Sequence, residues 1–300
     1  METKNLKSYY QRRKILVTGG AGFIGSHLVK KLVKFGAHVT VLDNFSTGNV
    51  SNLQKIVHKV ELIVGDIRSP EICQNATANK SIIFHLAAMV SVPKSTQCPE
   101  ECFDINTVGT NIMLKATTKH KTNARVIFSS SAAVYGDQNA VCRESIKANP
   151  QSPYAVSKLE GEKLCQNYVQ TSAGSAVALR YFNVFGPLNN DGVIAKFTAA
   201  LKNREKITIF GDGLQRRDYV PVEKVVEANL TAGAANTSGF ETFNIASGSS
   251  ITLMQLLKKL EAETGCQTAG INFKPVQSGD LLHSAADCSK FEKLLKTLSK

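Results

Sequence analysis

Along the first two thirds of the chain, short apolar runs alternate with longer segments of helical period. This order is typical of a parallel sheet covered by helices on both faces. The apolar runs predict strands at Ile15–Thr18, His38–Asp43, Val60–Val64, Ile82–Leu86, Arg125–Ser130 and Ala176–Tyr181. The segments between them predict helices at Ile24–Phe35, roughly Ser51–Val57, Glu100–Lys119 and Pro153–Gln170. We therefore expect an α/β fold built on a doubly wound parallel sheet.

Beyond Asn183 the pattern changes. Glycine- and asparagine-rich turns at 188–192 and 211–213 separate shorter elements, and a helix is predicted at Thr252–Thr264. We expect a sheet domain over residues 1–182, with a segment near 218–246 returning to it. A smaller C-terminal domain is expected over residues 183–300.

Composition narrows the class of protein. The 300 residues are 43% hydrophobic and 20% charged, as in ordinary globular proteins. No apolar run approaches the ~18–20 residues of a membrane helix, and the polar residues 1–13 lack the apolar core of a secretory signal. We expect a cytoplasmic protein that does not act at a membrane.

The net charge and the cysteines indicate which ligands and partners the protein can bind. The net charge of +12 favours anionic ligands such as nucleotides. Because the lysines are scattered, a solvated basic surface is favoured over a nucleic-acid site. Of the seven cysteines only Cys98 and Cys102 are close, without a zinc-ligand set around them. We expect no nucleic-acid partner, no metal site and reduced thiols.

A glycine-rich turn follows the first predicted strand. Gly19, Gly22 and Gly25 are spaced G-x-x-G-x-x-G between that strand and an amphipathic helix. Without Cβ atoms, the turn lets backbone N–H groups approach a pyrophosphate at the positive end of the helix. The segment predicts a Rossmann-type dinucleotide site.

Asp43 ends the second predicted strand, 18 residues after Gly25. A carboxylate there can accept hydrogen bonds from the adenosine ribose and repels a 2′-phosphate. Asn44 and Phe45 follow it, with no arginine that would receive such a phosphate. The predicted cofactor is therefore NAD rather than NADP, although a solvated loop aspartate is the alternative for Asp43.

Tyr154 and Lys158 stand at i and i+4 in a predicted helix that begins after Ser152. A phenol titrates near pH 10 and is a poor base at neutral pH. A neighbouring ammonium and the positive helix end favour the phenolate. We predict that Tyr154 is a catalytic base assisted by Lys158; the alternative is an exposed helix pair.

Several motifs in order give the chain a family resemblance. They are residues 18–25 (TGGAGFIG), 65–67 (GDI), 85–88 (HLAA), Asn106 before Gly109-Thr110, 129–136 (SSSAAVYG) and Tyr154-x-x-x-Lys158. Together they strongly resemble the extended short-chain dehydrogenase/reductases, and within them the UDP-glucose 4-epimerase group. The resemblance extends from about Lys14 to Lys290.

The resemblance implies the residues around a bound NAD. Residues matching Phe23 and Ile24 lie by the pyrophosphate, and those matching Asp66 and Ile67 lie by the adenine. The remaining matches along the cofactor are Asn44, Leu86, Ala87, Ala88, Asn106, Tyr154, Lys158 and Phe182. His85 is expected to be structural.

Ser131 is the expected partner of Tyr154. By resemblance it matches the residue that hydrogen-bonds the sugar hydroxyl, with Ser129 and Ser130 as competing candidates. Tyr154 would take the proton of the 4-hydroxyl while C4 passes a hydride to NAD. The 4-keto sugar would turn over and take the hydride back on its opposite face, so NAD should stay tightly bound.

Ala132 and Ala133 follow Ser131. Related 4,6-dehydratases and UDP-glucuronate decarboxylases carry acidic residues there, which eliminations require. Alanine cannot move protons, so C4 epimerisation is favoured over those two reactions. A non-enzymatic dinucleotide-binding protein is a further alternative, disfavoured by the intact Ser131, Tyr154 and Lys158.

The resemblance also implies a substrate end for a UDP-sugar. Asn183 and Arg217 match residues that contact its diphosphate; Arg217 could instead pair with Asp218 or Glu223, and Arg216 is the next candidate. The walls around uracil are matched by Val193, Ile209 and Phe210. Gln277 replaces a second arginine, which predicts weaker diphosphate binding or substitution by Lys274.

Ser284 matches a gate beside the C2 substituent of the sugar. Because serine is small, we expect UDP-glucose and UDP-galactose as substrates together with their N-acetyl forms. Relatives often dimerise through helices matching 100–119 and 153–170, so we expect a homodimer. Apolar residues on these helices are Ile112, Leu114, Leu159 and Leu164.

Overall fold

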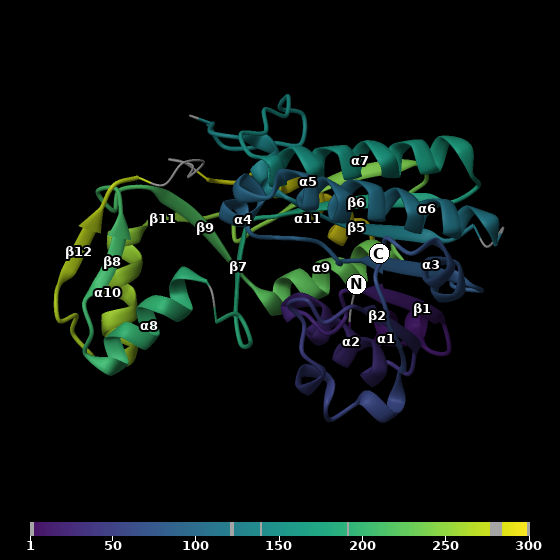
Figure 1. Cartoon of the computed structure of the whole chain (residues 1–300), viewed down its shortest axis with the longest axis horizontal. Helices are drawn as coiled ribbons and strands as arrows, with labels where there is room; N and C mark the ends of the chain where they lie inside the picture. The colour runs from purple at the N-terminus through teal and green to yellow at the C-terminus, as the bar shows by residue number, and fades with distance from the viewer. Residues whose placement is uncertain (1–2, 121–122, 139, 191, 277–283, 299–300) are drawn as a thin grey trace.

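A seven-stranded parallel sheet forms the centre of the structure (Figure 1). The computed structural model describes residues 3–120, 123–138, 140–190, 192–276 and 284–298. In spatial order the strands are β10 (Phe240–Ile245), β6 (Ser175–Tyr181), β5 (Arg125–Ser131), β4 (Ile82–His85), β1 (Lys14–Thr18), β2 (His38–Asp43) and β3 (Glu61–Val64). Every neighbouring pair is parallel. Strands β2 and β3 are added on one side of β1, and β4, β5 and β6 on the other. The order of the strands therefore reverses between β1 and β4, and sheets of this kind bind ligands at the carboxyl ends of the strands at that point.

Helices cover both faces of this sheet, because its central strands are apolar on both sides. One face carries α1 (Thr3–Tyr10), α2 (Phe23–Lys34) and α9 (Val222–Ala234). The other carries α3 (Pro70–Thr77), α6 (Thr110–Lys119) and α7 (Pro153–Thr171). The fold expected from the apolar pattern, a Rossmann-type sheet, is confirmed.

The chain returns to the large sheet after a long excursion. β10 pairs with β6 at the edge of the sheet, with Phe240 opposite Ala176. Helix α11 (Ser289–Leu298) packs on β10 through the contact of Phe291 with Phe243. How the chain divides into domains stays a prediction, but residues 222–245 lie with the large sheet.

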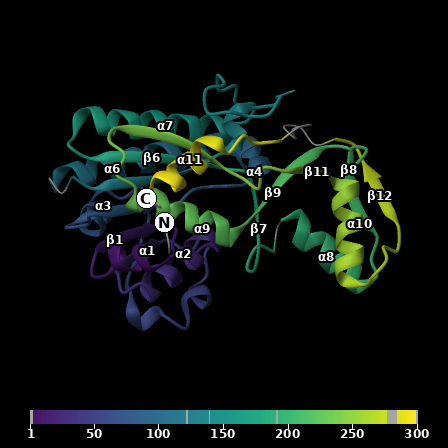
Figure 2. The same ribbon diagram turned by 180° about the vertical axis from the view of Figure 1, so that it is seen from behind.

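A smaller unit stands beside the sheet, as the reverse view makes clear (Figure 2). The helices α8 (Val193–Asn203) and α10 (Leu253–Thr264) pack on strands β8 (Ile207–Phe210) and β12 (Ile271–Lys274) around their own apolar core. Three strands connect this unit to the large sheet: β7 (Asn183–Phe185), β9 (Arg216–Pro221) and β11 (Ser250–Thr252).

Two of the predicted helices differ from the structure. The prediction of a helix near Ser51–Val57 is wrong: the segment forms two 3-10 turns, Val50–Leu53 and Val57–Lys59, after Asn49 accepts a bond from the Ser51 N–H. The helix predicted at 100–119 is divided into α5 (Pro99–Phe103), a π-helical turn (Asp104–Gly109) and α6. A π turn displaces the side chains that follow it, and here it turns Asn106 inward.

Some helices were not predicted. Besides α1, α3, α8, α9 and α11, they include α4 (Val92–Gln97) and a 3-10 turn at Ala132–Tyr135. Both α3 and α4 carry a serine cap, Ser69 and Ser91, followed by a proline in the first turn, which is a sequence signal for a helix start. None of the described helices combines the length and hydropathy that crossing a bilayer requires.

Candidate active site

The glycine turn joins β1 to α2 in a space without room for side chains. Gly19 has φ +66°, and a Cβ on it would lie 2.7 Å from the Ala87 nitrogen. A Cβ on Gly25 would lie 2.1 Å from the Gly19 oxygen. Gly22 is the N-cap of α2, whose first N–H groups no side chain caps. The turn therefore offers backbone donors at a positive helix end, as an anionic pyrophosphate requires.

Asp43 braces this turn from the carboxyl end of β2. Its Oδ2 accepts a hydrogen bond from the Ala21 N–H at 2.8 Å, and its Oδ1 accepts one from the Phe45 N–H at 2.9 Å. Each carboxylate oxygen retains a second lone pair. The side chain is thus held rigidly where an adenosine ribose would meet it.

Asp66 lies next to this position within a small ionic group. Asn44 donates to its Oδ2 at 2.9 Å, and Arg68 pairs with it at 2.8 Å while also reaching Asp104. The Arg68 guanidinium holds the pKa of Asp66 well below its usual range. Arg68 was not predicted, although it stands two residues after Asp66 of the Gly65-Asp66 motif.

His85 is structural, as expected. Its Nδ1 lies 2.7 Å from the Thr18 hydroxyl and its Nε2 lies 2.9 Å from the Thr110 hydroxyl. Burial, and secondarily Lys158, lower the pKa of His85 to about 3, so the ring is neutral. It ties β1 and β4 to α6.

Asn106 fixes the loop that carries Leu86, Ala87 and Ala88. Its Oδ1 accepts from the Met89 N–H at 2.8 Å, and its Nδ2 donates to the Met89 carbonyl at 3.0 Å. The same amide nitrogen donates to Ser157 Oγ at 2.9 Å. Asn106 therefore connects the loop after β4 to the helix of Tyr154. Ile67, the other expected adenine neighbour, is buried.

Tyr154, Lys158 and Ser131 converge, although they come from α7 and β5. Lys158 Nζ lies 5.9 Å from the centre of the Tyr154 ring and donates to the Ser129 carbonyl at 2.9 Å. Ser131 lies beside the Tyr154 phenol, whose pKa it lowers, and both side chains line the same cavity. The N-terminus of α7 is capped by Ser152, whose Oγ accepts from the Ala155 N–H at 3.2 Å.

The pKa of Tyr154 is shifted in the direction opposite to the one expected from Lys158 and the helix end. Burial raises the pKa of the phenol, and the neighbouring Ser131 offsets only part of that rise. Burial likewise lowers the pKa of Lys158 to about 8. Desolvation penalises a phenolate and an ammonium alike, so the protein alone does not bring Tyr154 to useful basicity.

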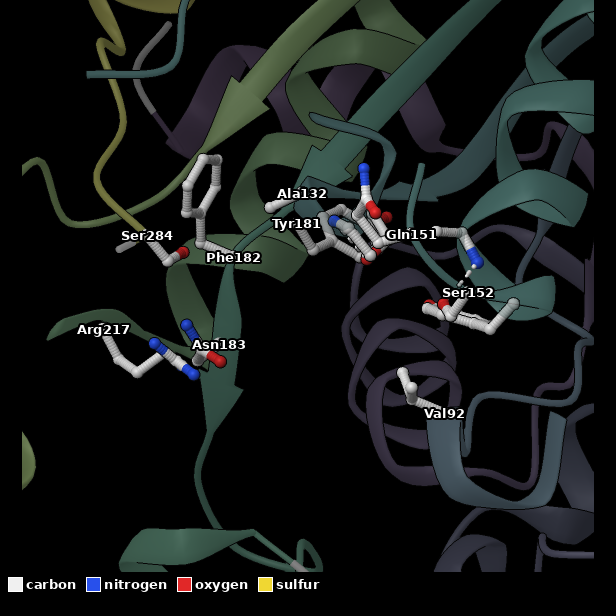
Figure 3. Close-up of a pocket in the computed structure, with 13 residues that line it drawn as sticks. Val92, Ala132, Gln151, Ser152, Tyr181, Phe182, Asn183, Arg217 and Ser284 are labelled. Atoms are coloured by element: carbon white, nitrogen blue, oxygen red, sulfur yellow. Dashed lines mark hydrogen bonds between the residues drawn. The ribbon is translucent and has the colours of Figure 1, made fainter. Parts of the chain in front are cut away.

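A cavity of about 220 Å³ opens in front of these side chains (Figure 3). It lies between the end of the large sheet and the connecting strands β7 and β9, which contribute Asn183 and Arg217. Its lining residues are Val92, Ser131, Ala132, Ala133, Gln151, Ser152, Tyr154, Ala155, Tyr181, Phe182, Asn183, Arg217 and Ser284. Ser131 and Tyr154 thus share one cavity with the expected diphosphate residues Asn183 and Arg217, whereas Lys158 is buried behind the lining.

The side of the cavity nearer the smaller unit is polar. Figure 3 shows Asn183, Arg217 and Ser284 grouped there, opposite Gln151 and Ser152. Asn183 Nδ2 donates to the Asp218 carbonyl at 3.1 Å. The Asp218 carboxylate accepts from the N–H groups of Ser247 and Gly248 at 2.7 and 2.9 Å, which anchors β9 beneath Arg217.

The residues expected around uracil lie apart from this cavity lining. Val193 begins α8 and is half-buried, and Ile209 is buried in the core of the smaller unit beside the half-buried Phe210. Gln277 lies outside the described residues. Val92, Gln151 and Tyr181 line the cavity but were not predicted. Gln151 directly precedes the Ser152 cap, and Tyr181 ends β6.

The sequence and the structure were compared with those of known proteins. A profile of the NAD dependent epimerase/dehydratase family matches residues 15–246. The chain belongs to this family. A putative UDP-glucose 4-epimerase of Methanocaldococcus jannaschii is 36% identical, over 93% of this chain and 92% of its own. A UDP-N-acetyl-alpha-D-glucosaminuronate decarboxylase of Bacillus cytotoxicus is 31% identical, over 84% and 81%.

Among solved structures, a UDP-N-acetylglucosamine 4-epimerase of Methanobrevibacter ruminantium M1, in complex with UDP-N-acetylmuramic acid, superposes with a TM-score of 0.89. It is 34% identical and covers 95% of this chain and 92% of its own. Membership of the family makes this chain an epimerase-like enzyme whose cofactor is NAD.

NAD fits the residues present. The uncapped α2 N-terminus behind Gly19, Gly22 and Gly25 suits its pyrophosphate, and the braced Asp43 suits its adenosine ribose. Phe23 and Ile24 form the first turn of α2. Among the described residues no cluster of His, Cys, Asp and Glu could hold a metal ion.

Proposed function

We propose that the enzyme interconverts UDP-hexoses that differ in configuration at C4 through a 4-keto intermediate. The observation that carries this proposal is the cavity itself. Ser131 and Tyr154 line its inner wall, and Arg217 and Asn183 line the wall near the smaller unit. A sugar between two such walls would have its reacting hydroxyl at Tyr154 and its diphosphate at the arginine fork.

Each side chain has a distinct task. Tyr154 removes the proton of the 4-hydroxyl, and Ser131 holds the oxygen as it becomes a carbonyl. Lys158, bonded to the Ser129 carbonyl, keeps a positive charge behind the phenol. The NAD⁺ held at the glycine turn would accept the hydride, and the NADH so formed would return it; a cationic ring near Tyr154 would favour the phenolate that burial disfavours.

Two alanines favour epimerisation over elimination or decarboxylation. Ala132 and Ala133 line the cavity directly after Ser131. A 4,6-dehydratase needs an additional acid and base at the sugar, and methyl groups supply neither. Glu144, a carboxylate nearby in sequence, accepts from the Asn244 N–H instead.

Ser284 sets the expected breadth of substrates. Its side chain lines the cavity and its N–H donates to the Arg216 carbonyl at 3.1 Å. A serine here leaves room for an acetamido group, so we propose UDP-glucose, UDP-galactose and their N-acetyl forms as substrates. The solved relative with a 34% identical sequence binds a nucleotide of an N-acetylated sugar, which supports this breadth.

The test is product analysis by NMR with no added NAD. UDP-galactose and UDP-N-acetylgalactosamine should each approach an equilibrium with their C4 epimer, and Tyr154→Phe should lower kcat at least about 10²-fold. UDP-glucuronate in a parallel reaction tests the alternative. Release of carbon dioxide, accumulation of a stable keto sugar, or a need for stoichiometric oxidant would each refute epimerisation.

A further inference from the structure

The last three residues of β5 each lie against a different turn of α7. Ser131 lies beside Tyr154 in the cavity lining, and the Ser129 carbonyl accepts from Lys158 Nζ at 2.9 Å. One turn further along the helix, Ser130 Oγ donates to Glu162 Oε1 at 2.5 Å. Tyr154, Lys158 and Glu162 are spaced four residues apart and so share one face of α7. The third of these contacts has no part in the proposed reaction.

Glu162 joins β5 and β6 to α7. Besides Ser130, it binds Arg180 twice, accepting from Nε at 2.9 Å and from Nη2 at 2.7 Å. Arg180 follows Leu179 in β6 and lies opposite Ser130 in the sheet register. Its guanidinium also covers the ring of Tyr135, 4.8 Å from the ring centre.

All three members of this group are buried: Ser130 is 2%, Glu162 4% and Arg180 6% exposed. The helix also approaches the strand closely at this level, because a Cβ on Gly161 would lie 2.3 Å from Cζ of Phe128. A buried ion pair of this kind adds little stability compared with apolar side chains of the same volume. It does fix geometry, since its forked hydrogen bonds allow one alignment of the partners.

We propose that Ser130, Glu162 and Arg180 form a positioning clamp that sets the register of α7 against the end of β5. The clamp acts through the backbone: it holds Ser130, and thereby its neighbour Ser131, level with Tyr154 two turns along the helix. It also explains which serine is catalytic. Ser130 is committed to Glu162 on one side of β5, and Ser129 Oγ donates to the Tyr181 hydroxyl at 3.2 Å on the other. Ser131 alone of the three lines the cavity.

The test separates positioning from stability, and its kinetic part rests on the proposed function. The double variant Glu162→Leu/Arg180→Met replaces the ion pair by apolar side chains, which should leave the protein folded with bound NAD. We expect kcat to fall about 10- to 100-fold with KM within about two-fold, because a displacement near 1 Å at a reacting group costs rates of this size. Ser130→Ala should lower kcat in the same way to a smaller extent, and Ser130→Thr should restore most of it.

Ser172→Ala is the matched control. It removes a hydroxyl that donates to the Tyr168 carbonyl at 2.7 Å just past the distant end of α7, and kcat should not change. A folded double variant with the kcat of the wild-type enzyme would overturn the clamp. Should the double variant not fold, unchanged kcat in Ser130→Ala would overturn it.

A second readout does not depend on the reaction. Crystal structures of the wild-type enzyme and of Ser130→Ala should show the contact between Ser131 and Tyr154 lengthened in the variant. An unchanged contact would refute the clamp even if the wild-type enzyme proved to catalyse another reaction, and a wild-type enzyme without epimerase activity would refute the proposed function alone.

Discussion

Lys158 is an ammonium that is only 3% exposed. Burial lowers its pKa to about 8, so it is charged below that pH and loses its charge as the pH rises. If the ammonium favours the phenolate of Tyr154, kcat should decline above about pH 8. Rates measured from pH 6 to 10, with circular dichroism at each pH to exclude unfolding, test this. A kcat that rises steadily to pH 10 would show that the charge is not needed.

Ser284 carries the prediction on specificity. Ser284→Tyr fills the space beside C2, so activity on the N-acetyl substrates should fall at least about 10-fold more than activity on UDP-galactose. The ratio of kcat/KM for the two substrates measures it. Equal losses on both substrates would mean that Ser284 does not face the C2 substituent.

At the scale of single residues, the sequence could predict those candidates that are recognised from positions close together along the chain. Tyr154 with Lys158, the glycine turn and Asp43 all follow from local geometry. Residues that meet only in the fold were missed: Arg68 reaches Asp104 across 36 residues, and Val92 reaches the cavity from the start of α4. The raised pKa of Tyr154 also depends on burial, which spacing does not reveal.

Among the elements, α1 anchors the N-terminal segment to the sheet. Tyr10 is fully buried, and its hydroxyl donates to the Leu230 carbonyl of α9 at 2.6 Å. Tyr10→Phe should lower the free energy of unfolding by about 1–2 kcal/mol, because that carbonyl loses its donor. Urea denaturation measures it, with kcat unchanged.

Tyr9→Phe serves as the comparison. The Tyr9 hydroxyl donates to the Gly233 carbonyl at 3.1 Å, but the residue is only half-buried, so water can replace the lost bond. Its effect should be smaller. Equal effects of the two substitutions would contradict the role given to burial of Tyr10.

Six of the seven strands of the large sheet were predictable because each contains an apolar run, whereas β10 was not predicted as a strand because polar residues interrupt its sequence FETFNI. The short helices were harder. The 3-10 turns at 50–59 have polar and apolar residues at helical intervals, but the Asn49 side chain caps the first of them. Helix α1 is polar in sequence, yet it buries Leu6 and Tyr10. The π turn that directs Asn106 inward leaves no periodic signal.

At the scale of the molecule, the expected homodimer remains a prediction. The apolar side chains named for that interface are largely used within the chain: Leu114 is buried, and Ile112, Leu159 and Leu164 are half-buried against the core. Light scattering on the purified protein, with a mass twice that of one chain, would support the dimer. A mass equal to one chain at micromolar concentration would contradict it.

In the whole molecule, Tyr154 of α7 and Arg217 of β9 line one cavity, and the central claim of the proposed function is that a hydride leaves C4 of the sugar and returns to it. UDP-glucose labelled with deuterium at C4 tests this directly when incubated with the enzyme and no added cofactor. NMR and mass spectrometry should show UDP-galactose that retains the deuterium at C4. Loss of the label to water, or a product unchanged at C4, would contradict the account.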